Sequence, residues 1–345
     1  MRSLLIVFLW TSITFGTECK NRDYIIEIGD SLTEISQKMY GESGFWSIIF
    51  EQNRDTIESP YEIRAGKTIE IPCIENKTPK KSISEEKPLE KEPTITQKRV
   101  KRPIKEIKDV EIVSTSRLYP FRIESSSHRD MLTDIVKALF DNLSEVSYSI
   151  DYIENSSIHP TLLKNNKYDI SLGWYRPNCS KKECQLIYSK PLFQAITALY
   201  RRKGSNEEIQ SPKDIYGKKI CRPKGWFTFD LEEQGLIDGK TMTLISKKTP
   251  TQCFSSLKDG KVDFVSLTSF VGDATLQKMG LSRYIESVKS ISTIVDLTVV
   301  AHKNGKNARA YINKFNQGLE KLDKSGKLEA IQSKYLKEFY DNIKN

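Results

Sequence analysis

The chain is poor in histidine, with three among its 345 residues, and beyond its N-terminus it has no run of 18 apolar residues. So little histidine leaves small scope for Ser/His/Asp catalysis or for a His-rich metal site. The lack of long apolar runs excludes a polytopic membrane protein. Cys-x-x-Cys pairs, phosphate loops and dinucleotide-binding patterns are also missing. We therefore expect no metal, no cofactor and no enzyme activity.

The three histidines are expected at the surface. His128 opens a predicted helix, His159 precedes Pro160, and His302 lies at the end of a predicted strand. No histidine can be assigned to a neighbouring nucleophile, which covalent catalysis would require.

The composition supports more than one domain. The chain is 38% hydrophobic and 29% charged, with a net charge of +9. It can bury sizeable cores, and its length exceeds one average domain. The positive net charge suggests an alternative function, which is binding to nucleic acid or to a membrane surface. No basic and aromatic nucleic-acid motif occurs, so we expect no nucleic-acid partner.

Residues 1–16 are typical of a secretory signal peptide. Arg2 supplies the positive charge, and the 15 residues after it are uncharged and mostly apolar. This stretch is short for a membrane-spanning helix, and we expect cleavage after Gly16. An uncleaved anchor is the alternative. Export predicts a periplasmic protein that is soluble or associated with the cell wall.

The chain has six cysteines. An even number in an oxidising compartment indicates disulfides rather than metal ligands. Although six cysteines allow 15 connectivities, their placement favours one of them. It pairs Cys19 with Cys73 around the first domain, Cys179 with Cys184 in a small loop, and Cys221 with Cys253 in a later segment.

Charge divides the chain into three parts. Residues 17–73 hold 6 Lys+Arg and 11 Asp+Glu, whereas residues 74–108 hold 11 and 6. This middle stretch has four prolines, no aromatic residue and few apolar ones, so it cannot form a core. We expect a disordered linker that spans roughly 30–35 Å between a first domain at 17–73 and a second at 109–345. Such a linker would let the second domain move around the first.

The first domain reads strand, helix, helix, strand. A β-rich segment at residues 24–28 precedes a Gly-Asp turn, and Ser31 with Glu34 forms a predicted capping box at the start of a helix. A second predicted helix ends near residue 53, and Ile69 and Ile71 alternate in a closing strand.

This βααβ arrangement resembles a LysM domain, a family that binds N-acetylglucosamine-containing glycans such as peptidoglycan. The resemblance rests on Tyr24, the turn Gly29-Asp30-Ser31-Leu32, Ile35, Tyr40-Gly41, Trp46, Ile49, Asn53, Pro60, Gly66 and Ile69-Glu70-Ile71-Pro72. The usual Pro-Gly before the last strand is Ala65-Gly66 here.

The LysM resemblance implies a shallow glycan groove between the turn before the first helix and the loop after the second. Carried over, the groove residues are Gly29, Asp30, Ser31, Leu32, Ser59, Pro60, Tyr61 and Glu62. As an alternative, Gly29 and Asp30 only shape the turn and no sugar binds. Gly-Asp-Ser-Leu is also the signature sequence of a class of hydrolases. This small domain does not fit that class, because it contains no histidine.

The second domain alternates strands with helices, which predicts an α/β architecture. A helix carries Met131, Ile135 and Leu139 at helical spacing, and a strand follows with alternating apolar residues from Val146 to Tyr152. Amphipathic stretches, including residues 311–322 and 328–340, end the chain.

This order resembles the type 2 periplasmic solute-binding proteins, in the family that binds polar amino acids for uptake transporters. The resemblance implies two lobes, one from 109–199 and 296–345 and the other from 203–292, joined by two crossovers that act as a hinge. The matching segments are Tyr119-Pro120-Phe121, Tyr168-Asp169-Ile170, Tyr188-Ser189-Lys190-Pro191-Leu192-Phe193, Asp214-Ile215-Tyr216-Gly217-Lys218-Lys219-Ile220, Leu257-Lys258-Asp259-Gly260-Lys261-Val262-Asp263 and Ser325-Gly326-Lys327-Leu328.

The pocket departs from this family at two positions. Its members hold the α-carboxylate with an Arg and the α-ammonium with an Asp, and those positions are Lys182 and Thr268 here. An ammonium without a carboxylate partner in a closed cleft would be costly, which disfavours an ordinary α-amino acid.

Aromatic residues and arginines stand at the predicted cleft instead. Aromatic rings stack on flat ligands and arginine pairs with anions, so we expect a small polar or aromatic anionic ligand. Plain lobe packing of Trp174 and Trp226, and surface roles for Arg176 and Asp230, are the alternatives. The predicted ligand-binding residues are Tyr119, Phe121, Trp174, Tyr175, Arg176, Lys182, Arg222, Trp226, Phe227 and Thr268.

The sequence thus predicts an exported solute-binding protein tethered to peptidoglycan. Its partners would be peptidoglycan, a small-molecule ligand and an inner-membrane uptake transporter of the ABC class. The alternative is a regulator of wall turnover or a muropeptide sensor, associated with an enzyme.

Overall fold

The computed structural model describes residues 20–27, 30–57, 63–74, 109–115, 130–141, 143, 146–179, 183–205, 208–237 and 241–344. The predicted signal peptide and most of the predicted linker lie outside these residues. Among the described helices, none is both long and apolar enough to span a membrane.

The first module, defined here as the described residues from 20 to 74, has the predicted βααβ order. Strands β1 and β2 pair antiparallel, with Tyr24 opposite Ile69. The predicted capping box is confirmed, because Ser31 and Glu34 bond reciprocally at the start of α1. The helix ends at Gly41, whose φ of 76° suits glycine. The elements are β1 (Arg22–Ile25), α1 (Leu32–Tyr40), the 3₁₀ turn η1 (Ser43–Phe45), α2 (Trp46–Gln52) and β2 (Thr68–Ile71).

In the rest of the described chain, a nine-stranded sheet has the order β4-β3-β5-β11-β7-β10-β8-β9, with β6 paired to β11. Strands β3, β4 and β5 are parallel, as are β8, β9 and β10. Strands β7 and β11 run antiparallel to each other and to their neighbours. The bounds are β3 (Asp109–Ser114), β4 (Ser147–Tyr152), β5 (Ile170–Tyr175), β6 (Leu186–Tyr188), β7 (Phe193–Arg202), β8 (Lys219–Pro223), β9 (Thr243–Lys247), β10 (Phe264–Thr268) and β11 (Ile285–His302).

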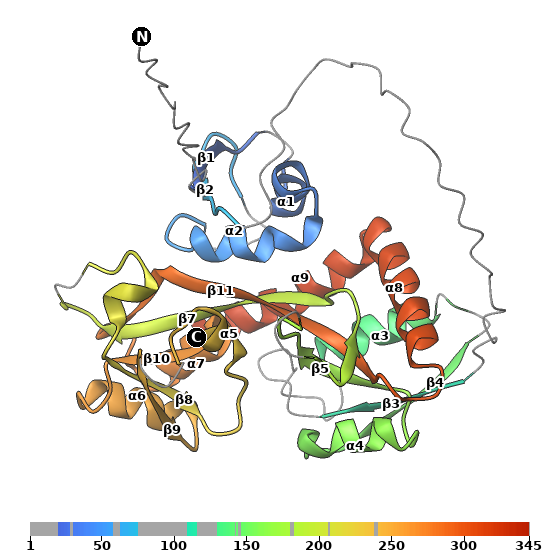
Figure 1. Ribbon diagram of the computed structural model, residues 1–345. Coiled ribbons are helices and arrows are strands. Elements are labelled where there is room, and N and C mark those ends of the chain that lie inside the picture. Colours follow the sequence, from blue (N-terminus) through green and yellow to red (C-terminus); the bar gives the residue numbers. More distant parts are fainter. Residues whose placement is uncertain are drawn as a thin grey trace, which may run out of the picture.

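Helices cover this sheet in two groups, as Figure 1 shows. Lobe one comprises β3 to β6 with α3, α4, α8 and α9, and lobe two comprises β8 to β10 with α5, α6 and α7. The bounds are α3 (Met131–Asp141), η2 (Ser156–Ile158), α4 (His159–Lys164), η3 (Pro212–Ile215), α5 (Phe229–Glu233), α6 (Pro250–Lys258), α7 (Ser269–Lys278), α8 (Ala308–Lys324) and α9 (Lys327–Lys344).

The long strands β7 and β11 connect the two lobes, and we call them the hinge strands. β11 pairs with β7 from Ile285 to Leu297 and with β5 of lobe one from Leu297 to Val300. The predicted two-lobed α/β fold with two crossovers is therefore confirmed. The residue boundaries assigned to domains and lobes stay predictions.

Helix packing in lobe one follows the predicted apolar faces. Met131, Ile135 and Leu139 of α3 are all buried. Helix α8 approaches α3 at Gly318, where a Cβ atom would lie 2.7 Å from the Leu139 side chain. Any larger residue at position 318 would force the buried Leu139 side chain to move, so glycine lets α8 pack closely against α3.

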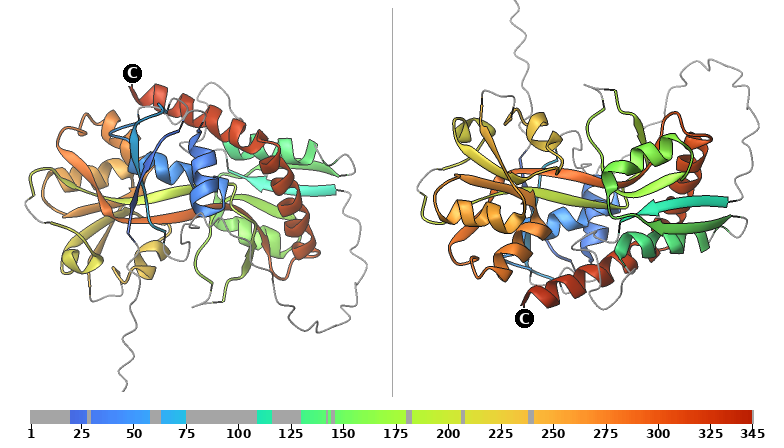
Figure 2. Two further views of the ribbon diagram at one scale, coloured as in Figure 1. Left: turned by 90° about the horizontal axis from the view of Figure 1, so that it is seen from above. Right: turned by 90° about the horizontal axis from the view of Figure 1, so that it is seen from below.

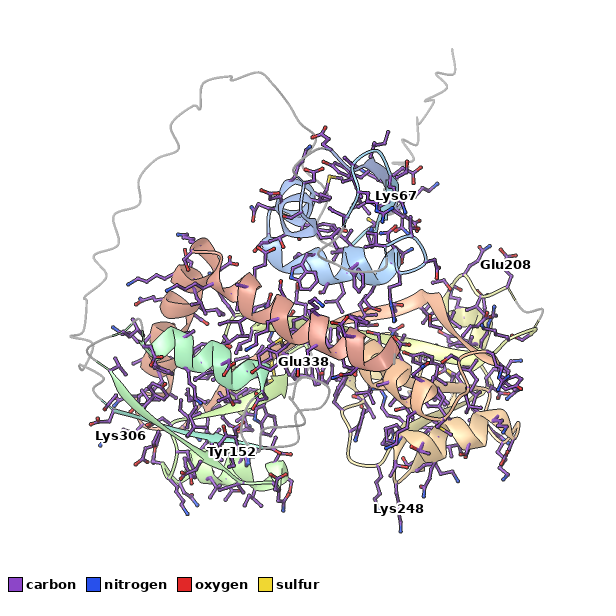
Figure 3. All side chains as sticks on the ribbon, turned by 180° about the vertical axis from the view of Figure 1, so that it is seen from behind. Lys67, Tyr152, Glu208, Lys248, Lys306 and Glu338 are labelled. Atoms are coloured by element: carbon purple, nitrogen blue, oxygen red, sulfur yellow. A yellow bond between two sulfur atoms is a disulfide. The ribbon has the colours of Figure 1, made fainter. Side chains whose placement is uncertain are left out.

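The first module docks on the hinge strands. Figure 1 shows it on the side of β7 and β11 away from the lobes, and the view from above in Figure 2 places it over both strands. Ile49 and Phe50 of α2 belong to one apolar core with Phe270 and Phe339 of the two-lobed part. Seen from behind, α9 passes beneath the first module (Figure 3).

This docking contradicts the expectation that the second domain moves freely around the first. The composition of residues 74–108 describes only the linker itself. That composition says nothing about α2, whose apolar residues pack against another surface of the protein. Phe50 uses that face, with its ring 5.3 Å from the ring of Tyr340 in α9.

Two predicted disulfides are confirmed: Cys179 bonds to Cys184 and Cys221 bonds to Cys253. Cys73 is also disulfide-bonded. Its predicted partner Cys19 lies outside the described residues, so that pairing stays a prediction.

Candidate binding sites

The interlobe junction lies at the carboxyl ends of parallel strands, where ligands bind in open α/β sheets. Strand β5 of lobe one ends at Tyr175, and β8 of lobe two ends at Pro223. The loop after β8 carries Phe227, and α5 follows it. The fold therefore positions several predicted ligand residues between the lobes.

An aromatic contact joins the two lobes at this junction. The Tyr175 ring lies 4.6 Å from the Phe227 ring, and Phe227 stacks on Phe229 at 4.9 Å. The backbone N–H of Asn178 also donates to Glu233 Oε1 across the lobes, at 2.8 Å. Burial raises the pKa of the Tyr175 phenol. Phe229 was not among the residues predicted from sequence, although its place beside Phe227 is an available signal.

Arg222 is fully committed within lobe two. Its side chain is only 2% exposed and is paired with Asp230, which is completely buried. The guanidinium donates to both oxygens of Asp230, to the carbonyl oxygens of Phe227 and Ser266, and to the Ser266 hydroxyl. These contacts use all five N–H groups of an arginine. Asp230 is therefore not a surface charge, and no donor of Arg222 is left for a ligand in this arrangement.

Arg176 faces the first module and not the aromatic contact. It is ion-paired with Asp296 of β11, whose carboxylate also accepts a 2.8 Å bond from Gln194 Nε2. Arg176 lines a cavity of about 520 Å³ between η1, the hinge strands and lobe one. The structure thus separates Arg176 from Arg222 and Phe227.

The remaining described residues of the predicted ligand set take different positions. Trp174 is half-buried and packs against the core of lobe one, Trp226 is exposed, and Thr268 is buried at the end of β10. Tyr119, Phe121 and Lys182 lie outside the described residues.

His159 lies in the core of lobe one, which overturns the expectation that it is exposed. Its Nε2 bonds to the Ile153 carbonyl at 2.9 Å and its Nδ1 to Ser171 Oγ at 2.9 Å. Because a carbonyl only accepts, Nε2 holds the proton, and Ser171 donates to Nδ1 while accepting from Trp174 Nε1. Burial lowers the pKa of His159. His302 is likewise buried, and His128 lies outside the described residues.

The turn before α1 is held by Asp30. Its Oδ2 accepts hydrogen bonds from Tyr24 Oη and from the Glu27 amide, both at 2.8 Å. Leu32 is buried beneath the turn. The predicted groove residues Gly29, Ser59, Pro60, Tyr61 and Glu62 lie outside the described residues.

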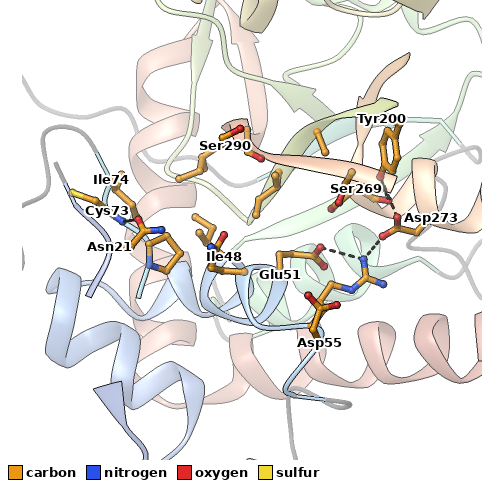
Figure 4. Close-up of a pocket in the computed structure, with 18 residues that line it drawn as sticks. Asn21, Ile48, Glu51, Asp55, Cys73, Ile74, Tyr200, Ser269, Asp273 and Ser290 are labelled. Atoms are coloured by element: carbon orange, nitrogen blue, oxygen red, sulfur yellow. Dashed lines mark hydrogen bonds and ion pairs between the residues drawn. The ribbon is translucent and has the colours of Figure 1, made fainter. Parts of the chain in front are cut away.

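An ionic cluster joins the first module to lobe two, drawn in Figure 4. Arg54 is ion-paired with Glu51 of α2 and with Asp273 of α7. Tyr340 of α9 donates to Glu51 at 2.6 Å, and Tyr200 of β7 donates to Asp273 at 3.2 Å. The cluster borders a cavity of about 680 Å³ between the first module, the hinge strands and α7.

Charges in this cluster depend on one another. Burial raises the pKa of the Glu51 carboxyl, although the Arg54 guanidinium opposes the rise. Burial alone would lower the pKa of Arg54. The negative charges of Glu51 and Asp273 have the larger effect, so the pKa of Arg54 is raised. Sequence reasoning missed this cluster, because no local pattern connects Arg54 to a residue 219 positions away.

The family comparison assigns the second module. Residues 112–338 match the model of the bacterial extracellular solute-binding proteins, family 3, which is more than half of the 345 residues. The chain belongs to this family. Family 3 proteins are extracellular binding proteins, which agrees with the two lobes and the aromatic contact between them.

Solved structures share the fold of this family 3 protein at low identity. A mutant of ArgBP from T. maritima has a TM-score of 0.50 at 21% identity, covering 66% of this chain and 95% of that one. A histidine kinase sensor domain with similarity to periplasmic binding proteins has a TM-score of 0.52 at 16% identity, covering 67% and 97%. A substrate-binding protein of an ABC uptake transporter from Streptococcus pneumoniae, with bound histidine, has a TM-score of 0.51 at 17% identity, covering 66% and 92%.

One curated relative matches a short part of the chain. The potassium binding protein Kbp of Escherichia coli O6:H1 is 37% identical over 49 residues, which are 14% of this chain. The match spans a third of that protein's length (33%).

Proposed function

We propose that this family 3 protein captures a small solute between its lobes while its first module holds it at peptidoglycan, in the periplasm. Captured solute would pass to an inner-membrane uptake transporter or be sensed. The observation that carries solute capture is the contact between Tyr175 of lobe one and Phe227 of lobe two. Rings contributed by both lobes allow a ligand to bind each lobe at once, and this is what drives hinge closure.

The aromatic residues favour a ligand with a ring or another flat group. The sequence also suggested an anionic group, for which Arg222 and Arg176 were the expected partners. Both arginines have carboxylate partners in the structure, Asp230 and Asp296. An anionic ligand would therefore have to displace an existing ion pair, so we propose a flat solute without a required negative charge.

Solute capture can be tested by native mass spectrometry of the full chain. The protein is incubated with amino acids, aromatic acids, amines, sugars and muropeptides in separate samples. Retention of a ring-bearing compound at one copy per chain supports the proposal. Retention of none of these classes contradicts it.

Wall tethering is proposed from the first module. Its βααβ order, its capped α1 and the Asp30 turn match the LysM resemblance. Co-sedimentation with purified sacculi tests the tether, with displacement by a soluble N-acetylglucosamine tetramer as the specificity control. A chain that stays in the supernatant would contradict wall tethering and leave solute capture untouched.

The alternative role as a muropeptide sensor is favoured by one observation. The first module contacts lobe one through Ser43 and Asp323, at 3.0 Å, and lobe two through Arg54 and Asp273. A module that touches both lobes is sensitive to their relative position. Retention of muropeptides in preference to free solutes in the same mass-spectrometry experiment would select this alternative.

A further inference from the structure

Helix α9 of lobe one faces the turn that starts α1 across a small cavity. The cavity measures about 200 Å³ and is lined from both modules. Glu329 and Ser333 belong to α9 and stand four positions apart, so they share one face of that helix. Thr33 donates a hydrogen bond to Glu329 across the boundary. The first module contributes Asp30, Ser31, Leu32, Thr33, Trp46 and Ile63.

The lining has the chemistry of a sugar site. Leu32 and Trp46 are buried and provide an apolar floor. Ser333 contributes a hydroxyl group, which both donates and accepts hydrogen bonds. The Ser31 hydroxyl also lines the cavity, but it already bonds to Glu34 in the capping box. The Asp30 carboxylate, whose Oδ2 accepts two bonds within the turn, also lines the cavity. A volume below the 300–1,000 Å³ of typical ligand pockets suits one ring and no larger group.

The geometry points to a composite glycan site, in which Glu329 and Ser333 of α9 form the second wall of the first module's groove. This inference rests on the proposed binding of peptidoglycan glycan. It adds that the solute-binding lobe takes part in recognising one amino-sugar ring. The complete site exists only while the first module is docked.

Charge defines the class of sugar. Among the described residues that line the cavity, the ionisable ones are Asp30 and Glu329, and both are acidic. Two carboxylates accept hydrogen bonds from sugar hydroxyl and amide groups and attract an ammonium group, but they repel an anionic sugar. The site therefore takes neutral N-acetylglucosamine and its de-N-acetylated, cationic form, and rejects uronic acids.

The test measures binding of three soluble probes to the full chain by titration calorimetry. They are an N-acetylglucosamine tetramer, its fully de-N-acetylated counterpart and a uronic-acid tetramer. The unsubstituted chain is expected to bind the first two and not the third. Ser333→Leu fills the cavity and should weaken binding of the neutral tetramer about tenfold or more, the loss typical of a central contact. Ser333→Ala, which cannot obstruct docking, should weaken it several-fold.

Glu329→Gln keeps an acceptor for Thr33 but removes the charge. It should abolish any preference for the cationic tetramer and change the affinity for the neutral tetramer less. Glu338→Gln is the matched control, because nine helical positions place Glu338 on the opposite face of α9; it is labelled in Figure 3. The control should bind all three probes like the unsubstituted chain.

The outcomes separate the two claims. If the unsubstituted chain binds the neutral tetramer and all Ser333 and Glu329 variants match Glu338→Gln, the composite site is wrong and the glycan function stands. If the unsubstituted chain binds neither amino-sugar tetramer and does not sediment with sacculi, the glycan function itself is wrong. Equal binding of the uronic-acid tetramer would overturn the inferred charge selectivity.

Discussion

Arg54 of the first module is ion-paired with Asp273 of α7 in lobe two, 219 positions further along the chain. Glu51 and Tyr340 extend this contact to α9. The first module is thereby attached to both lobes on the outer side of the hinge strands. This attachment connects the first module, for which we propose wall binding, with both lobes of a solute-binding protein.

Replacing Arg54→Ala should destabilise the protein, because it leaves Glu51 and Asp273 without their cation. We expect a loss of about 1–3 kcal/mol in the free energy of unfolding at neutral pH. This is less than for a fully buried pair, since the Arg54 side chain is 33% exposed. Urea unfolding of the full chain measures the loss. Lys324→Ala, which breaks an exposed pair with Glu320, should cost at most about 0.5 kcal/mol.

The Arg54→Ala loss should also grow with pH. Burial raises the pKa of Glu51, so the folded state favours the protonated carboxyl. Stability from such a group is present at acidic pH and is lost as the pH rises through the folded-state pKa. Without Arg54 this pKa rises further, so the variant should lose more stability than the parent chain between pH 5 and pH 8. An equal loss at both pH values would contradict the assignment.

Arg222→Ala should act on stability and not selectively on ligand affinity. It leaves Asp230 charged and fully buried, which typically costs about 3–5 kcal/mol. The double replacement Arg222→Met with Asp230→Leu should recover much of this loss, because no charge is then left buried. Urea unfolding measures all three chains. A stable Arg222→Ala chain that has lost only ligand binding would instead identify Arg222 as a ligand clamp.

Docking of the first module can be trapped covalently. Ser43 Oγ donates to Asp323 Oδ1 at 3.0 Å, so Ser43→Cys combined with Asp323→Cys should form a disulfide in the exported protein. Non-reducing peptide mapping detects it, and each single replacement serves as a control that should retain a free thiol. A double variant whose two thiols are joined neither under oxidising conditions nor by a short bifunctional thiol crosslinker would show that the first module does not dock this way.

The contact between Tyr175 and Phe227 predicts coupled effects on stability. Tyr175→Ala, Phe227→Ala and the double variant form a mutant cycle. Because the rings touch across the lobes, the coupling energy should be about 0.5–1.5 kcal/mol in the ligand-free chain. Additive losses in urea unfolding would mean that the lobes do not meet through these rings in solution.

Sequence patterns were sufficient to predict the helices and strands, but they did not predict where individual side chains point. The apolar spacing at residues 328–340 predicted a helix that is part of α9, and Ser31 with Glu34 predicted the start of α1. Both signals are local, with residues three or four positions apart contacting each other. The pairing of cysteines 32 residues apart was inferred from placement and is confirmed for Cys221 and Cys253.

Arg222 and His159 show where sequence reasoning ends. An arginine after a strand at a predicted cleft is equally compatible with a ligand contact and with an internal ion pair. The partner Asp230 decides between them, and only the fold brings it against Arg222. His159 was expected at the surface because it precedes a proline, but a proline at the start of α4 is compatible with a buried face. Docking of the first module depends on contacts between distant segments, which no local pattern encodes.

The thermal unfolding midpoint of the full chain, measured with and without each member of the solute panel, tests the central claim most directly. A ligand at 100 times its dissociation constant stabilises a protein by about 2.7 kcal/mol. Our account predicts that a ring-bearing solute raises the midpoint of the parent chain and that Phe227→Ala removes the increase. Solute capture between the lobes would be contradicted if no solute of the panel raised the unfolding midpoint. It would also be contradicted if Phe227→Ala and Tyr175→Ala left an increase unchanged.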